Sequence, residues 1–92
     1  MAEDMVRRGV ERSFSEWVDE LVRVSAPRVF ALVEEIDDEL GKDGQVVAWG
    51  MEFDDHAEVV AVEGGIRGSF RSALTAFELF SRKDPVQLVW VP

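Results

Sequence analysis

Apolar residues recur at helical spacing over residues 13–24, with charged residues on the opposite side. The apolar positions are Phe14, Trp17, Val18, Leu21 and Val22. Ser13 and Glu16 have the spacing of a capping box, in which each side chain satisfies a free backbone N–H, so we expect a helix to begin here. Residues 1–12 are expected to form a flexible N-terminal segment before a single domain over residues 13–92.

A second helix is predicted over residues 27–40, which read PRVFALVEEIDDEL. Pro27 disfavours helix for the residue before it, so this helix should restart with Ser25 as its cap and end at Gly41. Its apolar stripe comprises Val29, Leu32, Val33, Ile36 and Leu40. Phe30 projects about 100° from the stripe, which makes it either a core residue or part of a contact surface.

Two later segments have apolar residues on both faces of a strand. They are QVVAWGMEF at residues 45–53 and VQLVWVP at residues 86–92. Such strands belong in the middle of a covered sheet, because a strand with one face in water alternates apolar and polar residues. Residues 58–63 give another strand, and residues 66–70 give a third that alternates and should be half exposed.

A helix is predicted between Ser72, which can cap it, and Pro85, which ends it. The chain therefore reads as an α+β fold with the order ααβββαβ: two helices, a β-meander, a helix and a final strand. A strand, helix, strand unit should cross over right-handed and return the last strand parallel to the third. We expect a mixed sheet with strand order 4-1-2-3, in a compact chain whose radius of gyration is about 12 Å.

Composition and charge narrow the class of protein. The chain has 92 residues, no cysteine and a net charge of -9, and residues 14–63 hold fourteen of its nineteen acids. An acidic surface repels nucleic acid and anionic membrane and favours a basic partner. No apolar run of about 18 residues and no signal-peptide pattern is present, which favours a cytoplasmic protein. Eight arginines against two lysines suggest a bacterial genome rich in G and C.

The segment EFDDHAE, residues 52–58, is the one place where acid, base and metal chemistry could meet. Asp54, Asp55 and His56, with Glu52 or Glu58, could ligate a divalent metal, or His56 could act as a base. The chain offers no second histidine, cysteine or tyrosine to complete such a site. Because Asp is a favoured turn residue, a hairpin turn between two strands is the preferred interpretation.

The glycines of EGGIRGSF, residues 63–70, are the next candidate. Phosphate-binding loops place glycines between a strand and a helix with a lysine at a fixed offset, which this segment lacks. Gly64 and Gly65 are better explained by a tight turn. Arg67 and Arg71 lie on the exposed face of the predicted strand and could bind an anion or an acidic patch of another chain.

Catalytic motifs are absent from the sequence, and what stands out is surplus apolar surface: three tryptophans and six phenylalanines in a short chain. We therefore expect a non-catalytic protein–protein interaction module that needs no cofactor and self-associates, most simply as a homodimer. One alternative is an acidic inhibitor, resembling an immunity protein or antitoxin only in size and charge, of a basic enzyme such as a nuclease. A second alternative is a metal-binding protein or enzyme centred on His56. The expected partner contacts are Phe30, Glu34, Glu35, Asp37, Asp38, Arg67 and Arg71.

Overall fold

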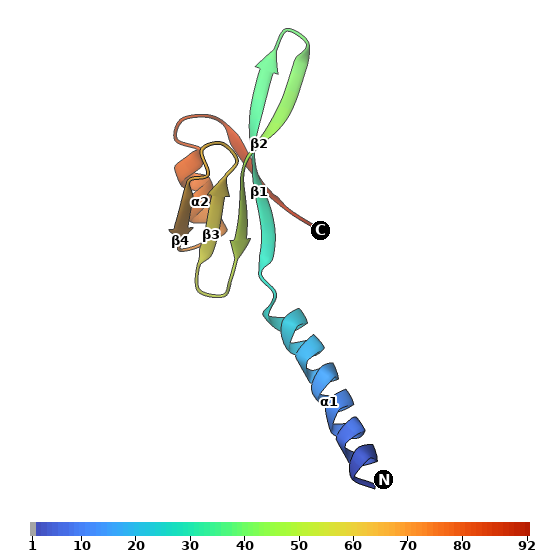
Figure 1. Cartoon of the computed structure of the whole chain (residues 1–92). Coiled ribbons are helices and arrows are strands. Elements are labelled where there is room, and N and C mark those ends of the chain that lie inside the picture. The colour runs from blue at the N-terminus through green and yellow to red at the C-terminus, as the bar shows by residue number, and fades with distance from the viewer. Residues whose placement is uncertain (1) are drawn as a thin grey trace.

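The computed structural model describes the backbone of residues 2–92 and the side chains of residues 13–92. The elements are α1 (Ala2–Ser25), β1 (Arg28–Asp38), β2 (Gly41–Glu52), β3 (Ala57–Ala61), β4 (Arg67–Phe70), α2 (Ala73–Phe80) and β5 (Val86–Trp90). The strands form one antiparallel sheet in the order β4-β3-β2-β1-β5, and α2 lies against one of its faces (Figure 1). The expected α+β class is confirmed.

The helix predicted over residues 27–40 is wrong, because this segment forms β1, the longest strand but one. It pairs with β2 along its whole length and with β5 over Phe30–Glu34. Phe30 and Leu32 point toward α2, whereas Val29 and Ala31 point to the opposite face. Backbone pairing on both sides overrides the helix propensity of leucine, alanine and glutamate. Consequently, Ser25 caps no second helix and the chain has two helices rather than three.

The predicted sheet topology is right in part. The meander over residues 45–70 is confirmed as β2, β3 and β4 in consecutive antiparallel order. The last strand runs in the same direction as β4, as expected, but β1 lies between it and β2. The order 4-1-2-3 and the mixed sheet are therefore wrong, since the extra strand makes every neighbouring pair antiparallel.

The core lies between α2 and one sheet face. Phe30 and Leu32 are fully buried, and the Phe30 ring meets the Trp90 ring edge-on with centroids 5.5 Å apart. The remaining buried apolar residues of this core are Ala48, Ala57, Val59, Ala73 and Ala76. Small residues on α2 let this short helix approach the sheet closely, so that a core forms even though α2 spans only 8 residues.

Helix α2 is fixed at its N-terminus by two oxygen acceptors. Ser72 caps it as expected, with its hydroxyl oxygen accepting from the Thr75 backbone N–H at 3.1 Å. The Glu52 carboxylate, from the end of β2, accepts from the Ala73 backbone N–H at 2.8 Å. This second cap joins the helix to the sheet and places a negative charge at the positive end of the helix dipole.

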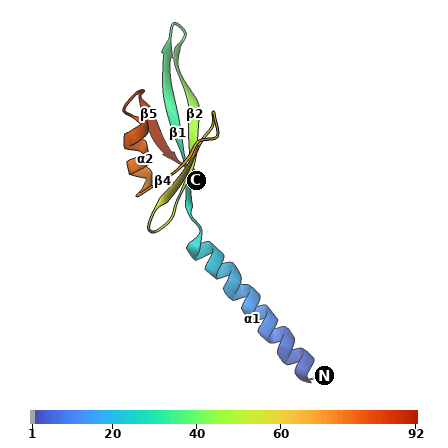
Figure 2. The ribbon, with the colours of Figure 1, turned by 60° about the vertical axis from the view of Figure 1, so that its left-hand side comes forward.

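Helix α1 extends away from the rest of the molecule, and both views show it leaving the start of β1 without returning to the sheet (Figures 1 and 2). Over the described residues it packs against no other element. The molecule measures 73 × 29 × 21 Å with a radius of gyration of 20.3 Å, well above the expected compact value. Within the described part, no helix is both long and apolar enough to cross a membrane. The prediction that this first helix begins at Ser13 is wrong, because α1 begins at Ala2. The flexibility of residues 1–12 stays a prediction.

The contact between Gly50 and Phe30 gives a test of the core. A Cβ atom added at Gly50 would overlap the Phe30 ring, which crosses β2 at this point. We expect Gly50→Ala to lower the free energy of unfolding by about 1–3 kcal/mol through overpacking, measured by urea denaturation.

The control is the same substitution made beside a smaller side chain. In a Phe30→Leu background, Gly50→Ala should cost clearly less than it does beside Phe30. Equal costs in the two backgrounds would contradict the packing of Phe30 over Gly50.

Candidate functional site

The sheet face opposite α2 is apolar, and no described element packs on it. Directly paired residues of neighbouring strands project to the same face, and a row of such pairs runs Val89–Ala31–Trp49–Val60 across four strands. Val29 and Met51 are paired beside this row, and the Val91 backbone N–H donates to the Val29 carbonyl at 2.8 Å. Six residues of this face have side chains that are 38–47% exposed, and we call them the open face: Val29, Trp49, Met51, Val60, Val89 and Val91.

Helix α1 carries a second uncovered apolar surface. The following residues, 46–73% exposed, are named the α1 stripe: Phe14, Trp17, Leu21, Val22 and Val24. The Phe14 and Trp17 rings lie 6.0 Å apart and form the aromatic end of the stripe. An amphipathic helix in a folded protein normally buries such a stripe, because propensity alone stabilises an isolated helix poorly in water.

The arginines predicted to contact a partner lie at one edge of the open face. Arg67 pairs with Val60 across β3 and β4 and so extends the row that contains Trp49. Arg71 directly follows β4. Among the described residues, neither arginine forms an ion pair within 4.0 Å.

The four acids predicted to contact a partner lie in the outer half of β1. This half pairs with Gly41–Gln45 of β2 to form a two-stranded arm that extends beyond the other strands (Figure 1). Glu34 and Glu35 lie at its base, where a Glu35 carboxylate oxygen accepts from the Gln87 side-chain amide at 2.6 Å. Asp37 and Asp38 are exposed near its tip. Because side chains alternate along a strand, the acids point to both faces of the arm rather than around a helix.

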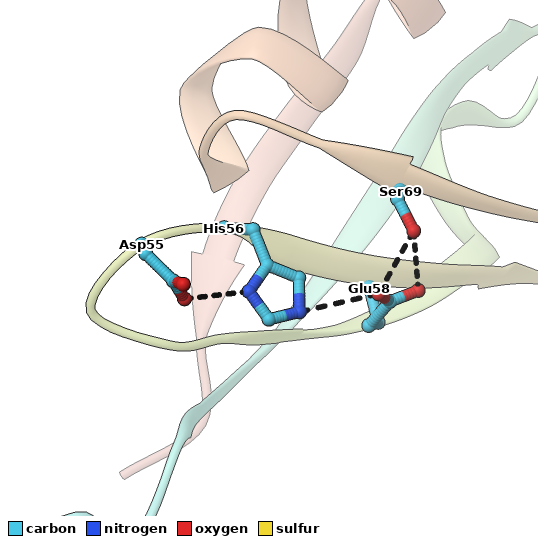
Figure 3. Close-up of polar contacts among 4 residues, drawn as sticks. All are labelled: Asp55, His56, Glu58 and Ser69. Atoms are coloured by element: carbon cyan, nitrogen blue, oxygen red, sulfur yellow. Dashed lines mark hydrogen bonds and ion pairs between the residues drawn. The ribbon is translucent and has the colours of Figure 1, made fainter.

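His56 lies at the β2–β3 hairpin, held between two carboxylates (Figure 3). Its Nδ1 is 2.7 Å from an Asp55 oxygen and its Nε2 is 3.2 Å from a Glu58 oxygen. Glu58 also accepts from the Ser69 hydroxyl at 2.8 Å, which links the hairpin to β4. The hydrogen bond to Asp55 is the main cause that raises the pKa of His56, and the same bond lowers the pKa of Asp55.

The hairpin interpretation of residues 52–58 is confirmed. The Phe53 backbone N–H donates to the His56 carbonyl at 2.7 Å, which closes a loop with Asp54 and Asp55 at its tip. The Phe53 and His56 rings stack with centroids 4.8 Å apart. The segment is therefore a tight turn, with two residues in the loop and two stacked rings beside it.

The His56 site favours a protonated ring over a metal ligand. Both ring nitrogens face carboxylate oxygens, an arrangement that suits the imidazolium, whereas a metal requires a neutral ring with one nitrogen free. No cluster of three or more metal-ligating side chains occurs in the part of the chain whose side chains are described. His56 thus lies in an exposed ion cluster with Asp55 and Glu58, and Asp54 lies beside it at the tip of the hairpin.

Two other results concern residues singled out by the sequence. Phe30 is fully buried, so the core alternative holds and Phe30 can touch no partner in this structure. The open face was not predicted from the sequence. The apolar residues of this segment also fit the spacing of a helix, so the strand alternation that places Val29 and Ala31 on one face was not recognised. The surplus of apolar residues was the available signal, and it indicated an uncovered surface without locating it.

Comparisons of this chain with protein-family models, with curated proteins and with solved structures find no match.

The pairing of His56 with Asp55 predicts a pH dependence. We expect the pKa of His56 to lie above about 6.5, its ordinary value, and Asp55→Asn to bring it down toward that value. The raised pKa of His56 stabilises the fold fully below about 6.5 and ceases to do so as pH rises through the folded pKa; the lowered pKa of Asp55 acts above about 3.9 and is lost on acidification. The stabilising window therefore lies between these two titrations.

NMR titration of the His56 ring protons measures this pKa directly, since the chain has one histidine. Asp54→Asn is the control, because no contact joins Asp54 to the ring, and it should shift the pKa less than Asp55→Asn does. Equal shifts from both substitutions would refute the pairing.

Proposed function

We propose that this chain is a non-catalytic, cytoplasmic protein–protein interaction module that self-associates through its apolar surfaces. The supporting observation is the coexistence of two uncovered apolar surfaces, the open face and the α1 stripe, in one small chain. Contiguous apolar surface of this extent is uncommon on monomeric soluble proteins and is typical of interaction sites. Each surface also contains a half-exposed tryptophan, a residue type enriched at the centres of interfaces.

The shape of the chain supports the same proposal. A helix that contacts no other part of its own chain gains no tertiary stabilisation, and a helix stripe rich in aromatic residues leaves much apolar area in water. A partner that covers the helix supplies that stabilisation. A symmetric homodimer is the commonest assembly of soluble proteins, and it requires no second gene product.

Self-association is tested by light scattering over a range of concentrations. We expect wild-type protein to form dimers, and Trp17→Glu or Trp49→Glu to raise the dimer dissociation constant by about 30-fold or more, since each places a charge in an interface centre. Leu40→Glu is the matched control, because Leu40 is 97% exposed in the turn between Asp38 and Gly41 at the arm tip and belongs to neither surface. A wild-type monomer at all concentrations would refute the proposal.

A second candidate function is inhibition of a basic enzyme through the acidic arm. The observation that favours it is the exposure of Asp37 and Asp38 on a hairpin that extends beyond the sheet, where Lys42 is the neighbouring cation. A narrow acidic projection can enter the anion-binding cleft of an enzyme such as a nuclease, and its charge would accelerate association.

The inhibitor candidate predicts charge-dependent binding to a basic protein captured from the native host. Reversing Glu34, Glu35, Asp37 and Asp38 to lysine should slow association, and added salt should weaken binding by the wild type. Glu78→Lys on α2 is the control for net charge, since it lies outside the arm. An association rate that changes neither with added salt nor with the four charge reversals in the arm would contradict the inhibitor candidate.

A further inference from the structure

We propose that the partner is a second copy of this chain and that the two copies exchange their N-terminal helices. In this dimer, the α1 stripe of each copy lies on the open face of the other. The inference rests on the proposed self-association and adds which surfaces meet. It follows from four properties of the chain: the dimensions of the two surfaces, the link between them, their flanking charges and the area that they offer.

The two surfaces match in size. The α1 stripe runs from Phe14 to Val24, which corresponds to about 15 Å along a helix axis. Across the sheet, the row from Val60 to Val89 covers four adjacent strands and so measures about 14 Å. Along β1, the face extends from Val29 to Val33, about 13 Å. One helix of this length therefore spans the open face in either direction.

The link between helix and sheet disfavours a return of α1 to its own open face. Only Ala26 and Pro27 separate Ser25 from Arg28, and Pro27 restricts Ala26 to extended conformations. No glycine lies between residues 10 and 40 to allow a sharp reversal. In both views the helix leads away from β1, the conformation that an exchanged helix needs (Figures 1 and 2). Short, stiff hinges of this kind favour exchange between copies.

The charges beside the two surfaces are complementary. Asp19 and Glu20 flank the α1 stripe on its two sides at helical spacing. Arg67, at the β4 edge of the open face, has no ion-pair partner among the described residues. Glu58 also projects to this face, but its carboxylate already contacts Ser69 and His56. Glu20 already contacts Arg23 of the same helix at 3.1 Å, so the complementary pair across the contact is Asp19 on the helix margin and Arg67 on the sheet margin. This pairing favours helix-on-sheet contact over contact between two copies of the helix.

The exchanged arrangement also buries enough area. Two helix-on-sheet contacts that covered both surfaces would bury on the order of 2,000 Å², within the range of stable homodimers. A dimer formed by α1 against α1 would bury only the stripes and leave both open faces in water. Helix exchange brings both sets into contact with one two-fold operation, and an assembly of this symmetry closes at two copies.

Site-directed cross-linking tests the arrangement cleanly, because the chain has no cysteine of its own. One variant carries Val22→Cys in α1 and a second carries Val60→Cys in β3; the two are mixed, allowed to exchange, and treated with a short bis-maleimide cross-linker. The expected main product is a dimer joining Cys-bearing α1 of one variant to the sheet of the other. Each variant alone should give little adduct, and Leu40→Cys mixed with Val22→Cys should give none above background.

The outcomes separate this inference from the proposed self-association. A dimer by light scattering whose main adduct joins two Val22→Cys chains, or which yields no helix-to-sheet adduct, overturns helix exchange and leaves self-association intact. A chain bearing both cysteines that cross-links only within itself, at all concentrations and as a monomer, overturns both. Circular dichroism of each variant confirms that the fold is retained before cross-linking.

Discussion

The sheet has two apolar faces and one short helix to cover them, and this imbalance governs the rest of the molecule. Helix α2 spans 8 residues and packs over Phe30 and Leu32 on one face. The other face presents Trp49 and Met51 to solvent at nearly half exposure. The chain does contain a second amphipathic helix, but α1 packs against no strand of the sheet over the described residues. The remaining face therefore stays exposed over the described residues, and the proposed function rests on that exposure.

Much of the fold was predictable wherever turn and cap residues agree with the apolar period. Ser72 marked the start of α2, and Asp54 and Asp55 marked a hairpin. The segment from Val29 to Leu40 was not predictable, since its apolar residues fit a helical stripe as well as a strand with two apolar faces. Only pairing with β2 and β5 decides between them, and that pairing joins residues far apart in sequence. Because β1 was assigned as a helix, the predicted strand order lacked the strand that lies between β2 and β5.

The candidate sites depend on the same assignment. Glu34, Glu35, Asp37 and Asp38 were correctly recognised as an acidic group, but their display on a projecting arm depends on β1 being a strand. Arg67 was placed correctly on an exposed strand face, whereas Trp49, two strands away in the same row, appeared from sequence to be covered. Surplus apolar content indicated exposed apolar surface, and long-range strand pairing determined where that surface lies. His56 lies at the hairpin between β2 and β3 and contacts Asp55 and Glu58 there.

Hydrogen–deuterium exchange of α1 tests most directly whether another chain covers this helix. An isolated helix without tertiary contacts exchanges its amides rapidly, whereas a packed helix is protected. The account predicts that amides of residues 14–24 are protected at concentrations where the chain is dimeric and lose that protection on dilution, while amides of the β1–β2 core remain slow. Rapid exchange in α1 at every concentration, or protection that dilution does not change, would contradict it.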